Sequence, residues 1–249
     1  MSQRRVAFLG GNGHCAARVA ASRSALAKDG IELADVRYPG FEGRERAADL
    51  EALLRSVSDE IAAVADAGLV YATGIGGLIA LCLRARGEWL DVPLLLQAPV
   101  LWGLERRLMP RLMRRGVAQA LVGRVFATRM FQRRFVRRHF ARPPSAEMRS
   151  AFFEGYARCA ALPDLFAWFT PRLLRELEGH LRDRPEAVQD IEVWWGGRDR
   201  VVSPRELAWT EEALGVKWPL RVFSGWGHYP MIDEAGAWSQ AVCSRAMRA

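Results

Sequence analysis

Two side chains near the end of the chain have types and surroundings suited to acid and base chemistry. Asp199 lies in the stretch GGRDRVVSP, and His228 lies in the stretch GWGHYP. Histidine has a pKa close to neutrality, so it can take up and release protons under ordinary conditions. A carboxylate beside it can fix its tautomer. These two stretches therefore point to proton transfer as the chemistry to test.

A third candidate for chemistry is the turn ATGIGG, residues 72–77. Its small residues two positions before and two positions after Gly74 meet the steric requirement of a sharp strand-to-helix turn that presents a nucleophile. A register centred on Thr73 would place Tyr71 and Ile75 where the backbones approach closely, so Thr73 is a poor nucleophile. The centre of the turn is Gly74, which has no side chain.

The elements that must position these residues alternate between strand and helix. The predicted strands are residues 6–9, 31–36, 69–73, 92–96, 191–195 and 220–223, and the predicted helices are 16–28, 45–65, 78–86, 204–214 and 234–247. This alternation predicts a parallel sheet with helices on both faces. Ligands bind at the carboxyl ends of the strands in such sheets, so we expect the candidate loops to converge there.

Between the fourth and fifth predicted strands the pattern changes to helical spacing. We predict an all-helical insertion, a lid or cap at residues 104–184, on a core formed by residues 1–103 and 185–249. The aromatic residues of the lid suggest an apolar pocket mouth. They are Trp102, which lies just before residue 104, and Phe126, Phe131, Phe135, Phe152, Phe153, Phe166, Trp168 and Phe169.

Together these motifs resemble the α/β-hydrolase superfamily, whose chain order is nucleophile, acid, histidine. The resemblance covers nearly the whole chain. It includes the glycine-rich loop at residues 10–13, the turn at 38–43, the helical lid and the two stretches around Asp199 and His228. It implies an α/β fold with a mostly parallel sheet of about six strands. The departure is Gly74, because the family usually has Ser, Asp or Cys there.

The resemblance implies roles for individual residues. His228 would be the general base, and Asp199 would fix its tautomer and support the imidazolium. The backbone N–H groups of Ile75 and Asn12 would form an oxyanion hole. We also expect the substrate to contact four residues. They are Gly11, Thr73, Trp102 and Tyr229.

Three explanations for Gly74 remain open, since covalent catalysis through that position is impossible. In the first, a cofactor-free enzyme acts at or beside a carbonyl, in an ester, thioester, lactone or C–C bond, and His228 activates water or removes a substrate proton. In the second, glycine replaces the serine of an ordinary serine hydrolase. In the third, a non-catalytic relative with a degenerate catalytic triad binds a ligand or partner under the lid.

The charge of the chain is uneven. The net charge is +8, but residues 106–140 contain eleven arginines and no acidic residue. This basic, amphipathic segment suits an anionic substrate, an acidic carrier protein or an anionic membrane surface. Nucleic acid is disfavoured, because no known binding module is recognisable. No apolar run is long enough for a signal peptide core or a membrane span, so we expect a cytoplasmic protein.

The cysteines and the other histidines say less about the function. Four separated cysteines indicate buried thiols, and no metal-ligand spacing is present, so we expect neither a metal nor a cofactor. Cys15 would be a replacement nucleophile only if it faced the site. His139 and His180 lie among charged residues, which predicts solvated side chains.

Overall fold

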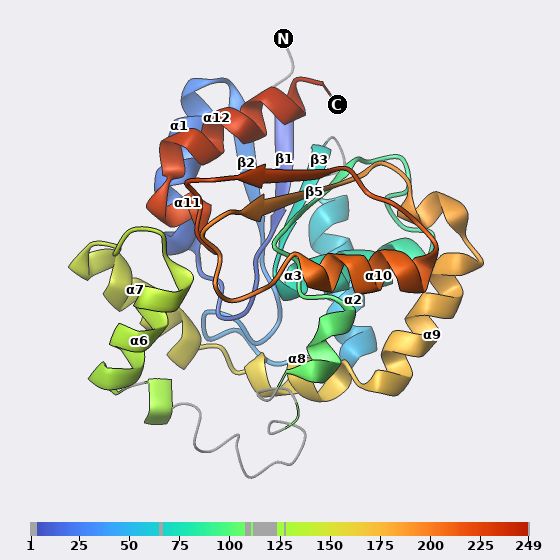
Figure 1. Ribbon diagram of the computed structural model, residues 1–249, viewed down its shortest axis with the longest axis horizontal. Helices are drawn as coiled ribbons and strands as arrows, with labels where there is room; N and C mark the ends of the chain where they lie inside the picture. The colour runs from blue at the N-terminus through green and yellow to red at the C-terminus, as the bar shows by residue number, and fades with distance from the viewer. Residues whose placement is uncertain (1–3, 65–66, 108–110, 112–123, 127, 249) are drawn as a thin grey trace.

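The protein is described by a computed structural model in which residues 4–64, 67–107, 111, 124–126 and 128–248 are placed. One six-stranded sheet forms its centre, in the order β2-β1-β3-β4-β5-β6, and every pair of neighbours is parallel (Figure 1). The strands are β1 (Arg4–Leu9), β2 (Ile31–Val36), β3 (Ala67–Thr73), β4 (Leu94–Gln97), β5 (Ile191–Gly196) and β6 (Leu220–Phe223). The predicted parallel sheet of six strands is confirmed.

Helices cover both faces of the sheet, as the alternating pattern predicts. Apolar side chains of α1 and α12 pack on one face, and those of α2, α3 and α10 pack on the other. The bounds are α1 (Ala20–Lys28), α2 (Leu50–Ala62), α3 (Ile75–Ala85), α10 (Arg205–Leu214), α11 (Pro230–Asp233) and α12 (Ala235–Ala246). Short 3-10 helices lie at Ala16–Val19, Trp102–Arg106 and Pro185–Val188.

Helix α2 begins later than the sequence pattern predicts. The predicted helix starts at residue 45, but α2 starts at Leu50 because Asp49 is its N-cap, and the Asp49 carboxylate accepts a hydrogen bond from the Ala52 N–H (2.7 Å). Asp is among the strongest N-cap residues, since its oxygen satisfies an N–H that has no partner inside the helix.

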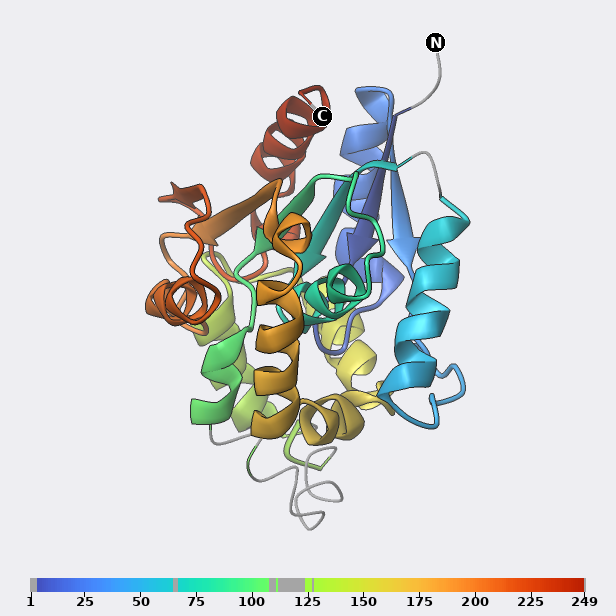
Figure 2. The same ribbon diagram turned by 90° about the vertical axis from the view of Figure 1, so that its right-hand side faces the viewer.

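The described part of the insertion between β4 and β5 contains no strand. Its helices are α6 (Arg129–His139), α7 (Ala146–Ala157), α8 (Leu162–Trp168) and α9 (Pro171–Arg182). Figure 2 shows that α6, α7 and α8 lie beyond the carboxyl ends of the strands, whereas α9 packs on the core helices α3 and α10. The lid bounds 104–184 remain a prediction, and α9 is in contact with the core.

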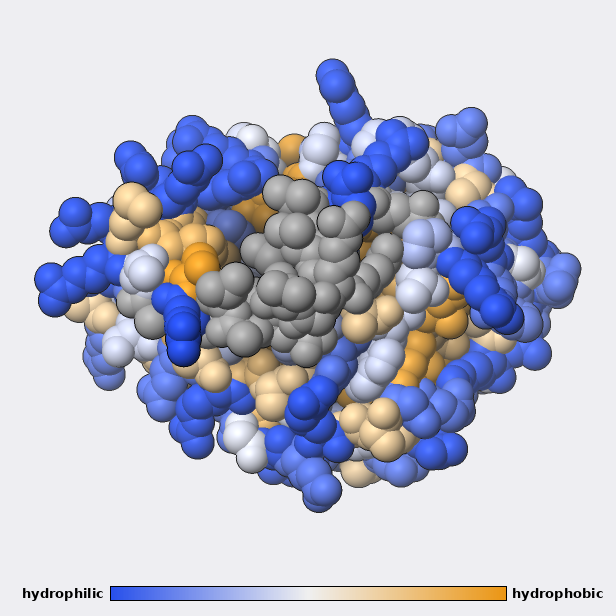
Figure 3. Space-filling model, turned by 90° about the horizontal axis from the view of Figure 1, so that it is seen from below, coloured by the Kyte–Doolittle hydropathy of each residue, from blue (hydrophilic) through white to orange (hydrophobic). Residues whose placement is uncertain are grey.

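The surface at the lid end is mainly hydrophilic. Seen from below, it carries many hydrophilic side chains with apolar areas between them (Figure 3). Within the placed residues, no helix combines the length and the apolar character that crossing a membrane requires.

Candidate active site

The turn between β3 and α3 has the backbone geometry of a nucleophile elbow. Gly74 has φ 54° and ψ −121°, a conformation that L side chains rarely adopt. A Cβ at Gly76 would lie 2.7 Å from the Leu9 carbonyl oxygen, so only glycine fits where α3 passes β1. A Cβ at Gly74 would meet only the Cα of Gly11, at 3.7 Å. The turn therefore leaves space for a side chain that Gly74 does not supply.

Asp199 and His228 meet at the ends of β5 and β6. Asp199 Oδ2 lies 2.8 Å from His228 Nδ1, and the Asp199 side chain is 0% exposed. The other oxygen, Oδ1, accepts hydrogen bonds from the N–H groups of Val201 (2.7 Å) and Val202 (3.2 Å). Burial raises the pKa of Asp199, but the attraction of His228 and these hydrogen bonds outweigh it and hold the pKa below its ordinary value. Asp199 is thus a carboxylate, and His228 Nδ1–H donates to it.

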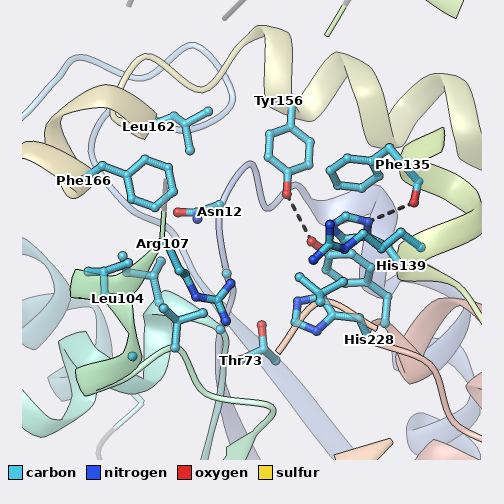
Figure 4. Close-up of a pocket in the computed structure, with 18 of the residues that line it drawn as sticks. Asn12, Thr73, Leu104, Arg107, Phe135, His139, Tyr156, Leu162, Phe166 and His228 are labelled. Carbon is cyan, nitrogen blue, oxygen red and sulfur yellow. Dashed lines mark hydrogen bonds between the residues drawn. The ribbon is translucent and has the colours of Figure 1, made fainter. Parts of the chain in front are cut away.

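A cavity of about 600 Å³ lies above these residues. His228, Gly74 and Thr73 line it on the core side. Figure 4 shows the His228 ring at its edge with Thr73 nearby. In the described part of the chain, no hydrogen bond joins Thr73 to His228, which agrees with the view that Thr73 is not an activated nucleophile.

The loop after β1 forms another side of the cavity. Gly11, Asn12 and Ile75 line it, and neither the Asn12 nor the Ile75 N–H donates a hydrogen bond to another placed residue. Ile75 is the first residue of α3, where the N–H has no partner inside the helix. Buried Arg18 holds the loop, since its Nη1 donates to the Asn12 carbonyl (2.9 Å). Two backbone donors are therefore available beside Gly74.

Comparison with known proteins shows the family of the chain. Residues 8–241 match the sequence profile described as the alpha/beta hydrolase family. The chain belongs to the alpha/beta hydrolase family. No curated protein matches its sequence.

Solved structures share the alpha/beta hydrolase fold with this chain. An esterase from Exiguobacterium antarcticum is 18% identical, with 99% of this chain and 92% of that chain covered and a TM-score of 0.72. A loop variant of a haloalkane dehalogenase from Bradyrhizobium elkanii is 17% identical, with 99% and 89% covered and a TM-score of 0.71. A 2-hydroxy-6-oxo-6-phenylhexa-2,4-dienoate hydrolase from Rhodococcus sp. strain RHA1 is 16% identical, with 99% and 91% covered and a TM-score of 0.68. At these identities the likeness shows the fold alone.

A second histidine enters the site of this alpha/beta hydrolase from the lid, which the sequence analysis missed. His139, the last residue of α6, lines the cavity, and its ring stacks on Phe135 with 3.5 Å between centroids. The prediction of a solvated His139 is wrong, while His180 is exposed as predicted. Burial, followed by repulsion from His228, lowers the pKa of His139 to about 3.

The hydrogen bonds of His139 fix its state. Its Nδ1 lies 2.9 Å from the Phe135 carbonyl oxygen, which only accepts, so Nδ1 carries the proton and Nε2 carries a lone pair. The His139 carbonyl oxygen accepts a hydrogen bond from the His228 N–H (2.9 Å). This hydrogen bond therefore joins the lid to the loop that carries His228, the predicted general base. No local sequence pattern predicts that His139 enters the site, because the hydrogen bond to His228 joins segments that are distant in the chain.

Of the residues predicted to contact the substrate, Tyr229 lines the cavity and Trp102 does not. The Tyr229 hydroxyl lies 3.1 Å from that of Tyr156 on α7, and burial raises the pKa of both. Trp102 is half-buried and packs against the hydrophobic core. It is not among the cavity residues.

Cys15 does not take the place of the absent nucleophile. It is buried and outside the cavity lining, and its thiol donates to the Ala151 carbonyl (3.7 Å). Burial raises its pKa, which disfavours the reactive thiolate. Among the placed residues, no three His, Cys, Asp or Glu side chains gather where they could hold a metal ion.

Proposed function

We propose that this protein is a cofactor-free enzyme that acts at or beside a carbonyl, without a serine nucleophile. The bond is an ester, thioester, lactone or C–C bond of a hydrophobic substrate. The observation that carries the proposal is the 2.8 Å contact between Asp199 Oδ2 and His228 Nδ1 at the edge of a cavity whose floor is Gly74. A buried carboxylate bound to a histidine that faces a cavity is the arrangement that acid and base catalysis requires.

In the proposed reaction, His228 Nε2 removes a proton from a water molecule above Gly74. The water oxygen then bonds to the substrate carbonyl carbon, and the carbonyl electron pair moves to its oxygen. The Ile75 and Asn12 N–H groups stabilise that oxyanion. When the tetrahedral intermediate collapses, the leaving group departs and His228 returns the proton to it, while Asp199 stabilises the imidazolium in between. No covalent bond to the protein forms.

The competing function is a binding protein with the same pocket. It is favoured by Gly74, because loss of the nucleophile is the change expected in a relative that no longer catalyses. Oxyanion stabilisation and binding alone can still leave about 10³ to 10⁴-fold catalysis over water, so Gly74 does not by itself decide between the two.

The substitution His228→Ala separates these functions. We expect wild type to hydrolyse at least one member of a panel of aryl esters, thioesters and lactones, and His228→Ala to lose at least about 10²-fold of that rate. His180→Ala, on the exposed face of α9, is the matched control and should keep it. Ligand-induced thermal stabilisation should survive in both variants. Binding without turnover in wild type would refute catalysis and support the binding protein.

A further inference from the structure

The cavity is strongly cationic for a pocket with apolar walls. Four arginines line it, against one glutamate, Glu206. The arginines are Arg106, Arg107, Arg134 and Arg138. Positive charges outnumber negative ones even when the buried Asp199 behind His228 is counted. A concave, low-dielectric site lined by one sign of charge concentrates ligands of the opposite sign.

Arg107 is a cavity arginine that faces the proposed catalytic residues. Figure 4 shows Arg107 and His228 projecting into the cavity from opposite sides, with Thr73 between them. Arg107 Nη2 donates to Glu206 Oε1 (2.7 Å), and the two side chains are 25% and 12% exposed. This ion pair is the single hydrogen bond of the Arg107 guanidinium within the described residues, and its Nε is buried without a partner. Glu206 therefore orients Arg107 but leaves most of its five N–H donors unused.

Unlike Arg107, the other three arginines form no ion pair with a carboxylate within the placed part of the chain. The Arg106 guanidinium lies 3.8 Å from the ring centroid of Trp209, which holds it by a cation–π contact. Arg138 Nε donates to the Arg200 carbonyl (2.9 Å), so its terminal nitrogens remain available. Arg134 on α6 forms no hydrogen bond with another placed residue. All three residues are exposed to solvent and line the cavity.

Apolar side chains complete the walls. Leu104, Leu162 and Phe166 lie beside Arg107 in the cavity (Figure 4). Glu206 offsets the partial burial of the Arg107 charge, and the Arg107 Nε stays buried without a partner among the placed residues. Arginine is also suited to bind carboxylate or phosphate through two parallel hydrogen bonds.

We propose that the pocket selects amphipathic anions, in which a carboxylate or similar group binds Arg107 and an apolar part fills the space between Leu104 and Phe166. The anionic group then lies opposite His228, which places the bond to be attacked between them. This inference rests on the proposed function for the identity of the site, and it names the class of substrate.

The test compares two probes of the same shape and different charge, 4-phenylbutanoate and 4-phenylbutanamide, by calorimetric titration at low and high salt. We expect wild type to bind the carboxylate at least about tenfold more tightly than the amide, with the preference reduced by salt. Arg107→Gln should reduce the preference to less than about threefold. Arg175→Gln, an exposed arginine on α9, is the matched control and should keep it.

Arg107→Gln leaves the largely buried Glu206 without its partner, so the double variant Arg107→Gln/Glu206→Gln is measured beside it. Loss of the preference in both variants supports direct recognition of the anion. Equal binding of both probes to wild type, a preference retained in the double variant, or no binding of either probe up to about 10 mM overturns the proposal. His228→Ala should keep the preference whether or not the protein is an enzyme, which separates this test from that of the proposed function.

Discussion

Gly74→Ser is the substitution that most directly tests the geometry of the elbow. The added Cβ would lie 3.7 Å from the Cα of Gly11, an ordinary contact, so the side chain fits. The backbone at φ 54° and ψ −121° costs a non-glycine residue about 1–3 kcal/mol. The reduced freedom of the unfolded chain offsets about 0.4–1 kcal/mol of this. We expect a net loss of about 1–2 kcal/mol in unfolding free energy, which lowers Tm by roughly 2–8 °C.

The same substitution should create a nucleophile. The serine hydroxyl would lie above the turn, where His228 can take its proton. In a complete triad, removal of the serine lowers kcat by up to about 10⁶-fold. We expect aryl ester hydrolysis to exceed that of wild type by at least about tenfold and an acyl adduct to appear at residue 74 by mass spectrometry. Gly74→Ala has the same strain without the hydroxyl, so it should show a similar Tm and no adduct.

A second control is Gly74→Ser/His228→Ala, which should fold and fail to acylate. A folded Gly74→Ser that forms no adduct with activated esters or organophosphates would refute the assignment of this turn as a nucleophile elbow aligned with His228. A loss of more than about 4 kcal/mol in Gly74→Ala would show that the space above Gly74 is smaller than the backbone geometry implies.

Three further predictions concern stability and proton transfer. Gly76→Ala should destabilise the fold by about 1–3 kcal/mol in denaturant unfolding, because its Cβ would lie 2.7 Å from the Leu9 carbonyl oxygen. Asp199→Asn should keep the fold by circular dichroism but lower turnover at least about 10²-fold, because an amide facing His228 favours the wrong tautomer. His139 is neutral in the folded protein down to about pH 3, while the unfolded chain takes up its proton near pH 6.5, so stability should fall as pH decreases through that interval by up to about 1.4 kcal/mol per unit. His139→Phe should flatten this dependence.

Each of these predictions has an outcome that contradicts it. Unchanged stability in Gly76→Ala would mean that the strand and helix do not approach closely. Turnover that persists in Asp199→Asn would remove the carboxylate from the mechanism. Equal acid sensitivity of wild type and His139→Phe would show that another group is responsible for it.

The sequence was sufficient for the sheet because the strands are short segments bounded by turn residues, and β4 is entirely apolar apart from its last residue. The bounds predicted for 31–36 and 220–223 coincide with β2 and β6. The same local signals placed Gly74 at the centre of a turn and Asp199 and His228 on adjacent strand ends, where they meet. In a parallel sheet the loops at the carboxyl ends of the strands lie at one edge, so the convergence of these three residues follows from the predicted topology.

The lid side of the site could not be predicted in the same way. Arg107 is one of eleven arginines in its segment, and no local feature separates it from those that face solvent. Arg107 differs from the other arginines by its ion pair with Glu206, which is far away in the chain. His139 is half-buried, and its contact with the loop of His228 is tertiary. Helical periodicity describes which residues share a face, but it does not say what that face meets.

The hydrogen bond from the His228 N–H to the His139 carbonyl has a mechanical consequence. A Cβ at Gly227 would lie 2.5 Å from the Ala141 nitrogen, so the segment after α6 and the loop that carries His228 are in close contact beside that bond. The end of α6 is thereby tied to the loop that carries His228, so a displacement of this end would displace that loop as well. Inserting or deleting a residue near the end of α6 would displace the His228 imidazole. The length of this segment therefore matters to the site as much as its composition does.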